Sequence, residues 1–114
     1  MLTIYGIANC DSCRAAKRWF STRGIDYTFH DVRTDGLTAS LVSDWLNRLG
    51  NETLINTRSK TWRNISPHIR AQLDATNACE LILQFPTLIK RPLVDNGSAA
   101  LVGYDEEGWS RILA

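Results

Sequence analysis

Two cysteines with the spacing Cys10-Asp11-Ser12-Cys13 are the residues of this chain best suited to do chemistry. Such a pair can cycle between a dithiol and a disulfide, because the thiolate of one cysteine attacks a disulfide and the second cysteine resolves the mixed disulfide. Cys10 comes first, at the exposed start of a predicted helix, and is the predicted nucleophile. Cys13 follows about one helical turn later and is the predicted resolving thiol.

The surrounding sequence predicts that the two cysteines lie where a strand passes into a helix. Residues 2–5 form a short apolar run that is typical of a buried strand, and residues 6–9 are typical of a turn. A helical pattern starts at about Asp11, and Gly24 ends it. One face of this helix is apolar and carries Ala15, Ala16, Trp19 and Phe20.

A helix start of this kind favours a negative charge on a thiol. Its unpaired N–H groups and its dipole stabilise an anion, so a cysteine there loses its proton more easily. Arg14, Lys17 and Arg18 add positive charge nearby. The sequence therefore predicts a reactive thiolate at Cys10, with Arg14 among the groups that stabilise it.

Two other interpretations of the cysteine pair stay open. One is half of a zinc site, for which Cys79, His30 and His68 are the remaining ligands and form no second close pair. The other is a pair of buried structural cysteines. The strand-then-helix setting favours redox chemistry over both, so no metal site is expected. Cys79 is expected to be a buried residue without a redox role.

Length and composition exclude several classes of protein. The 114 residues suffice for a single domain, 1–114, with its own core. A net charge of +1 argues against binding nucleic acid through bulk charge, and no apolar run approaches a membrane span. Residues 1–5 lack the basic and apolar regions of a signal peptide. Three cysteines, an odd number, form no secreted disulfide framework, so the cytoplasm is the expected location.

A second strand is predicted after the first helix. Residues 25–32 are rich in β-forming side chains, and a turn follows at Thr34-Asp35-Gly36. A strand, a helix and a strand within this length imply a βαβ unit with parallel strands.

The middle of the chain, about residues 38–85, is predicted to be mostly helical. The expected helix starts are Thr38 or Ser40, Ser66 followed by Pro67, and Asn77 with Glu80 as a capping box. Gly50 ends the first of these helices and Pro86 the last. Side chains expected to face inward are Leu41, Val42, Trp45, Leu46, Leu49, Ile69, Leu73, Ala78, Leu81, Ile82 and Phe85.

The last third of the chain predicts a hairpin and a helix. Residues 92–95 and 99–102 flank Asn96-Gly97, the strongest short hairpin signal. Asp105 is the expected cap of the final helix, whose inward face carries Trp109, Ile112 and Leu113. The predicted fold class is α/β: a thioredoxin-like fold with a four-stranded mixed sheet and a helical insert, about 38–85, between its βαβ and ββα halves.

Four motifs follow one another along nearly the whole chain. They are Tyr5-Gly6 leading to Cys10-Asp11-Ser12-Cys13-Arg14, Ile55-Asn56-Thr57-Arg58-Ser59-Lys60, Leu88-Ile89-Lys90-Arg91-Pro92-Leu93-Val94, and Val102-Gly103-Tyr104. In this order and spacing the sequence resembles the arsenate reductase (ArsC)-like family, which includes the redox-sensing transcription regulator Spx.

The resemblance implies a role for each matching position. Cys10 corresponds to the nucleophilic cysteine of the family. Arg58 and Arg91 correspond to two arginines that hold the oxyanion beside this thiol in the arsenate reductases. A planar guanidinium suits a tetrahedral oxyanion or the carboxylate of a thiol tripeptide, and both arginines would lower the pKa of the thiol. Pro92 corresponds to a proline that thioredoxin-like folds often hold in cis.

This chain departs from the pattern of some family members and matches that of others. Arsenate reductases carry a third arginine after the final hairpin, where this chain reads Val102-Gly103-Tyr104-Asp105. They also do not require Cys13, since they commonly use glutathione and glutaredoxin. The cysteine pair resembles Spx, in which it is a disulfide switch and the protein docks on the C-terminal domain of the RNA polymerase α-subunit. Spx proteins continue with a charged tail, whereas the sequence ends at Ala114, a length that resembles a short bacterial branch suggested to be glutathione-dependent thiol reductases.

The function predicted first is therefore a thiol-dependent oxidoreductase, a glutathione-linked thiol reductase. Cys10 attacks, Cys13 or glutathione resolves the intermediate, and Arg58, Arg91 and Arg14 hold the anionic substrate. The alternatives are an Spx-type regulator that binds the RNA polymerase α-subunit, and an arsenate reductase. No bound cofactor is expected beyond glutathione or another thiol as reductant, and no direct contact with nucleic acid or a membrane.

Overall fold

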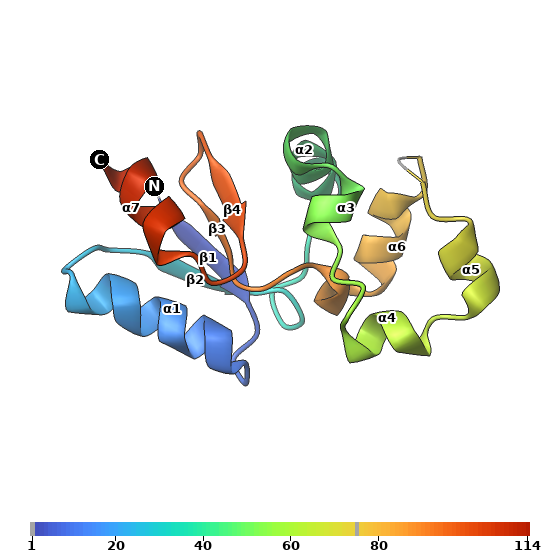
Figure 1. Ribbon diagram of the computed structural model, residues 1–114, viewed down its shortest axis with the longest axis horizontal. Helices are drawn as coiled ribbons and strands as arrows, with labels where there is room; N and C mark the ends of the chain where they lie inside the picture. Colours follow the sequence, from blue (N-terminus) through green and yellow to red (C-terminus); the bar gives the residue numbers. More distant parts are fainter. Residues whose placement is uncertain (1, 75) are drawn as a thin grey trace. The chain divides into compact units, whose positions relative to one another are not determined.

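The chain forms two compact units, which Figure 1 shows in the colours of the sequence. The computed structural model describes residues 2–74 and 76–114. Met1, part of the stretch tested above for a signal peptide, and Ala75, in the predicted helical region, lie outside the described residues. One unit comprises Met1–Asp35 and Arg91–Ala114, and the other comprises Gly36–Lys90.

A mixed sheet of four strands in the order β2-β1-β3-β4 forms the base of the first unit. β1 (Thr3–Gly6) pairs in parallel with β2 (Thr28–Asp31) and in antiparallel with β3 (Leu93–Asp95). β3 in turn pairs in antiparallel with β4 (Ala100–Val102). The predicted mixed sheet, with its parallel βαβ unit and its final hairpin, is confirmed.

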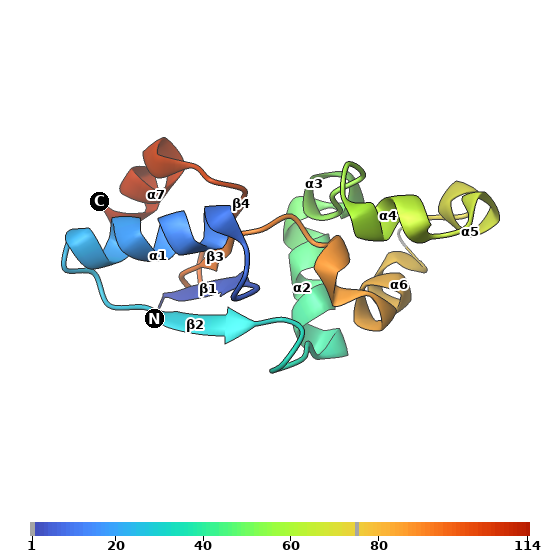
Figure 2. The ribbon, with the colours of Figure 1, turned by 90° about the horizontal axis from the view of Figure 1, so that it is seen from below.

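Helices α1 (Asp11–Thr22) and α7 (Glu106–Leu113) cover one face of this sheet, as Figure 2 shows. Side chains alternate along β1, so Ile4 points to this face, and it pairs in register with Val94 of β3. The buried cluster between helices and sheet consists of Leu2, Ile4, Ala16, Trp19, Phe20, Val94 and Trp109. Burial of these apolar side chains holds both helices on the sheet and so fixes where α1 begins.

The C-terminus of α1 is closed at Gly24, as the sequence predicts. Gly24 has φ 69°, a left-handed conformation that glycine adopts at little cost. Its N–H donates to the Ser21 carbonyl, and the Ile25 N–H donates to the Phe20 carbonyl, each at 3.0 Å. This pair of bonds is a Schellman motif. Residues 25–27, predicted as strand, belong to the loop that follows it, so β2 is shorter than the sequence indicates.

The second unit is helical. Its first helix, α2 (Ala39–Leu49), is capped by Thr38, whose side-chain oxygen accepts the Leu41 N–H at 3.2 Å, and Gly50 follows it as predicted. The remaining elements are α3 (Asn51–Leu54), α4 (Lys60–Asn64), α5 (Pro67–Ala71), α6 (Ala78–Gln84) and the 3-10 helix η1 (Pro86–Leu88).

Backbone hydrogen bonds tie the two ends of the α4–α6 segment together. The Asn56 N–H donates to the Leu88 carbonyl and the Lys90 N–H to the Leu54 carbonyl, both at 2.8 Å. Within the segment, the buried side chains Ile65, Leu81 and Leu88 form a small core against Trp62, Leu73 and Phe85. These contacts make short helices stable that would not form alone in water.

Several side-chain details of the sequence prediction are wrong. Cys79, expected to be buried, is only half-buried. Ile69 and Leu113, expected to face inward, are 46% and 38% exposed. Ile69 lies in α5, a helix of only five residues, and Leu113 is the last residue of α7. Asn77 forms no side-chain cap on α6. Its side chain instead accepts the Asp74 N–H at 2.8 Å and donates to the Gln72 carbonyl at 2.7 Å, which closes the preceding turn.

Candidate active site

The two neighbouring cysteines lie at the first turn of α1, where the chain leaves β1. Cys10 is the N-cap residue, with extended backbone angles of φ −115° and ψ 124°. Its carbonyl accepts the Arg14 N–H at 2.9 Å, which starts the helix. Cys10 is half-buried and Cys13 is buried, and both are free thiols. The helical period turns Cys13 inward beneath Cys10.

Hydrogen-bond donors converge on the sulfur of Cys10. Burial alone would raise the pKa of the Cys10 thiol. Hydrogen bonds from the Cys13 N–H, the Cys13 thiol, the Arg91 side chain and the Ser12 N–H outweigh burial and hold this pKa below its ordinary value. The two helix N–H groups act on the sulfur although the side chain makes no ordinary capping bond. The sulfur of Cys10 is therefore built to carry negative charge.

Cys13 has the opposite character. Burial raises the pKa of its thiol to about 11. The Ile7 N–H and the charge of Arg91 oppose this rise, whereas the neighbouring Cys10 adds to it. Cys13 thus keeps its proton at neutral pH and donates it in a hydrogen bond to the Cys10 sulfur. Of the two thiols, Cys10 is therefore the one that loses its proton first.

Arg91 and Pro92 stand directly before β3. The Arg91–Pro92 peptide bond is cis, which confirms the proline as the predicted cis candidate. The Pro92 carbonyl accepts the Gly103 N–H at 2.9 Å, just past β4. Because β3 is the antiparallel neighbour of β1, the start of β3 lies at the same edge of the sheet as the end of β1. This pairing brings Arg91 to Cys10.

The sequence analysis missed Asp31, which holds the loop in front of Cys10. Asp31 ends β2 and is 8% exposed. One carboxylate oxygen accepts the Ala8 N–H at 3.0 Å, and the other accepts the Arg33 N–H at 2.9 Å. Arg33 also reaches back, with its guanidinium 2.8 Å from the Asn9 side-chain oxygen. Both residues just before Cys10 are thereby fixed from the end of β2.

The charge on Asp31 is stable at neutral pH. Burial alone would raise the pKa of its carboxyl, but the N–H groups of Arg33, Ala8 and Thr34 outweigh burial and hold the pKa below its ordinary value. A signal for this residue was present in the sequence. Parallel strands end at the same edge of a sheet, so polar residues after the second strand lie beside the loop after the first.

The other two predicted arginines have different surroundings. Arg14 forms an ion pair with Asp11 and donates to the Ala8 carbonyl at 3.3 Å, so it braces the loop from the helix side. Arg58 belongs to the second unit, in the turn before α4. Its N–H donates to the Asn56 side-chain oxygen at 3.0 Å, and its carbonyl accepts from Arg63 at 2.9 Å. Its role in substrate binding stays a prediction.

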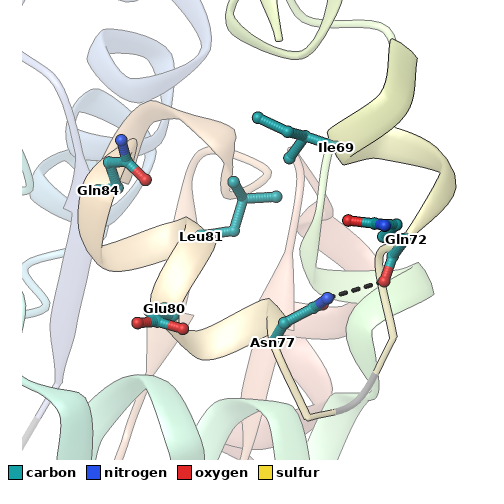
Figure 3. A pocket seen from close by; sticks show the side chains of 6 residues that line it. All are labelled: Ile69, Gln72, Asn77, Glu80, Leu81 and Gln84. Carbon is teal, nitrogen blue, oxygen red and sulfur yellow. Dashed lines mark hydrogen bonds between the residues drawn. The ribbon is translucent and has the colours of Figure 1, made fainter. Parts of the chain in front are cut away.

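A pocket of about 200 Å³ lies within the second unit (Figure 3). Ile69 and Leu81 point toward one another across it, and a bond from the Asn77 side chain to the Gln72 carbonyl closes one end. Gln84 and Glu80 complete its lining. None of the residues predicted for thiol chemistry lines this pocket, so it is not the candidate site.

In residues 2–74 and 76–114, no three His, Cys, Asp or Glu side chains are grouped to hold a metal ion. No helix within those ranges is long and apolar enough to cross a membrane.

Comparison with known proteins gives the family of the chain. Residues 5–112 match the model of the ArsC family. The global transcriptional regulator Spx of Lactiplantibacillus plantarum is 31% identical over 115 residues, which cover 99% of this chain and 86% of that protein. This protein therefore belongs to the ArsC family, as the four motifs predicted.

Solved structures confirm the fold. The structure of the YFFB protein is 32% identical, covers all of both chains and has a TM-score of 0.94. That of an arsenate reductase (ArsC)-related protein from Brucella melitensis is 36% identical, with a TM-score of 0.77 over 98% of this chain and 93% of that one. The predicted α/β, thioredoxin-like fold of the ArsC proteins is thus confirmed.

Proposed function

We propose that this protein is a thiol oxidoreductase that reduces mixed disulfides, with glutathione as the reductant. The observation that carries the proposal is the asymmetry of the thiol pair. Four hydrogen-bond donors lower the pKa of Cys10, whereas burial holds the proton on Cys13. A thiolate at a half-exposed sulfur is the form that attacks a disulfide.

The reaction begins when the Cys10 thiolate attacks one sulfur of a substrate disulfide, such as a glutathione adduct of a thiol. The substrate S–S bond breaks, and the departing thiolate takes up a proton from solvent. Cys10 is now joined to glutathione. A glutathione thiolate then attacks this mixed disulfide, which releases oxidised glutathione and restores the Cys10 thiolate.

Cys13 offers a second route for the same intermediate. After losing its proton, its sulfur attacks Cys10, expels glutathione and leaves a Cys10–Cys13 disulfide, which two further thiols reduce. Arg91, beside Cys10, holds a carboxylate of the glutathione moiety, since a guanidinium pairs well with carboxylates. The family resemblance assigns the same task to Arg58.

The experiment is reduction of the mixed disulfide of glutathione and 2-mercaptoethanol, followed through the consumption of glutathione. The wild type should turn over, Cys10→Ser should be inactive, and Cys79→Ser should match the wild type. Activity of Cys13→Ser would assign the resolving step to glutathione, and its loss would assign that step to Cys13. Full activity of Cys10→Ser would contradict the proposal.

A redox-sensing regulator is the second candidate, and the similarity to Spx over 99% of the chain favours it. In this function, oxidation of Cys10 and Cys13 to a disulfide changes a surface that binds the C-terminal domain of the RNA polymerase α-subunit, and no turnover is needed. Binding of that purified domain, measured with and without oxidant, tests it. Equal absence of binding in both states would remove this candidate.

A further inference from the structure

Gly6, the last residue of β1, lies directly against the sulfur of Cys13. A Cβ atom added at Gly6 would stand 2.3 Å from Cys13 Sγ and 3.3 Å from Cys13 Cβ, and 3.6 Å from the nearest atom of Phe29. Ordinary van der Waals contacts of a Cβ lie at 3.4–4 Å. Both Cys13 atoms therefore lie closer than an ordinary contact, and the sulfur is the atom that an added methyl group would have to displace furthest.

The backbone does not require glycine at this position. Gly24, Gly36, Gly50, Gly97 and Gly103 have left-handed φ angles, whereas Gly6 does not. Its backbone continues the parallel ladder, in register with Asp31 of β2. An alanine could adopt this extended conformation without strain. The reason for glycine must therefore be the space that a side chain would occupy.

That space is filled by Cys13 Sγ. The sulfur lies under the end of β1, where it receives a hydrogen bond from the N–H of Ile7 and makes another with Cys10. A buried helix side chain has few alternative rotamers, so a sulfur driven out of this place loses both contacts together.

We propose that Gly6 is a positioning residue of the thiol pair: its missing side chain leaves the room in which Cys13 Sγ meets both Cys10 and the Ile7 N–H. The meaning of this role for catalysis rests on the proposed function. The geometry itself does not, because it concerns only how the two sulfurs are held.

The test is a double-mutant cycle of Gly6→Ala and Cys13→Ala. In the wild-type background, Gly6→Ala displaces the sulfur, so the pKa of Cys10, measured by pH-dependent alkylation, rises to the value of Cys13→Ala. In the Cys13→Ala background the sulfur is gone, and Gly6→Ala leaves that pKa unchanged. Oxidation to the Cys10–Cys13 disulfide slows roughly tenfold to a hundredfold in Gly6→Ala, as expected for a reacting atom misplaced by about 1 Å.

Equilibrium unfolding of the same four proteins is the second measurement. Gly6→Ala destabilises the protein that has Cys13 and leaves Cys13→Ala unaffected. If Gly6→Ala does not fold, a folded double variant supports the proposal and an unfolded one overturns it. Equal changes in both backgrounds, or an unchanged Cys10 pKa in Gly6→Ala, also overturn it. Neither measurement needs turnover, so an inactive protein with this pattern would refute the proposed function alone.

Discussion

Two helix starts in this molecule carry a cysteine, and they differ in what surrounds the sulfur. At α1, Cys10 is the N-cap, and two helix N–H groups, a second thiol and Arg91 all act on its sulfur. At α6, Cys79 is the second helical residue. Its sulfur accepts from the Ser43 hydroxyl at 3.6 Å and its thiol donates to the Ala39 carbonyl at 3.7 Å, both in α2.

A helix start alone therefore does not make a reactive thiol. The sulfur must lie where the free N–H groups point, which the N-cap position provides and the second helical position does not. It also needs a cation from elsewhere in the chain. Cys10 gains Arg91 because β3 pairs beside β1, whereas Cys79 takes part in packing one helix against another.

The largest difference between the two cysteines is expected when each is replaced by serine. Under the proposed function, Cys10→Ser lowers the rate of mixed-disulfide reduction on the order of a thousandfold or more, since no other group can form the covalent intermediate. Cys79→Ser leaves the rate within about twofold, because its sulfur serves packing. Steady-state assays of the two variants measure both rates. Equal losses of rate in Cys10→Ser and Cys79→Ser would contradict the assignment of Cys10 as the nucleophile.

Arg91 accounts for part of the difference between the two thiols. Arg91→Ala removes a hydrogen bond to the Cys10 sulfur, so the pKa of Cys10 rises and alkylation of Cys10 at neutral pH slows severalfold. The matched control is Arg14→Ala, whose guanidinium is paired with Asp11. It should change this pKa less. The pKa of Cys10 in both variants is measured from alkylation rates at a series of pH values. A larger rise of this pKa in Arg14→Ala than in Arg91→Ala would contradict the role given to Arg91.

Asp31 tests whether the loop before Cys10 must be held. Asp31→Asn weakens the bonds to the Ala8 and Arg33 N–H groups and costs about 1–3 kcal/mol of unfolding free energy. The carboxyl pKa is depressed in the folded state. Its stabilisation is therefore present above the unfolded pKa of about 4 and is lost as pH falls through the folded value. Asp31→Asn should lose that acid dependence in urea titrations, and a retained dependence would exclude Asp31 as its source.

A further effect is expected at alkaline pH. Cys13 has a pKa of about 11 in the folded protein, against about 8.5 for an unfolded thiol. Between these values the unfolded chain loses a proton that the folded one keeps, so stability falls as pH rises. Cys10, with its lowered pKa, contributes the opposite sign. The unfolding free energy of Cys13→Ala, measured from about pH 8 to 11, should not show this decline. A steeper decline in Cys13→Ala would mean that Cys13 is not the thiol with the raised pKa.

Much of the fold could be predicted because local signals agreed with tertiary structure. Gly24 and Thr38 stand where predicted helices end and begin, and Asn96-Gly97 joins a hairpin. The errors fall where tertiary contacts decide. Ile69 has the right spacing for a buried residue, but a helix as short as α5 offers no second layer to cover it.

The two cysteines of the site could be predicted from the sequence, whereas the residues that hold them in place could be predicted only in part. Cys10 and Cys13 are recognisable because strand, turn and helix signals surround them in sequence. Asp31 and Gly6 act on the pair through space, across a strand pairing and an atomic contact. The sequence pattern places Asp31 at the right edge of the sheet, but it reports neither the register of the strands nor a distance of 2.3 Å, so the contacts of these two residues come from the structure.

The order of the strands also determines when the cysteine site can form during synthesis of the chain. β1 is an inner strand, and its two partners arise at very different times: β2 follows within one helix, whereas β3 comes only after the whole of Gly36–Lys90. Closing so long a loop is entropically costly and slow. A nascent chain released as far as Lys90 holds both cysteines but neither Arg91 nor β3. The thiol therefore gains its full acidity only after Arg91 and β3 have left the ribosome.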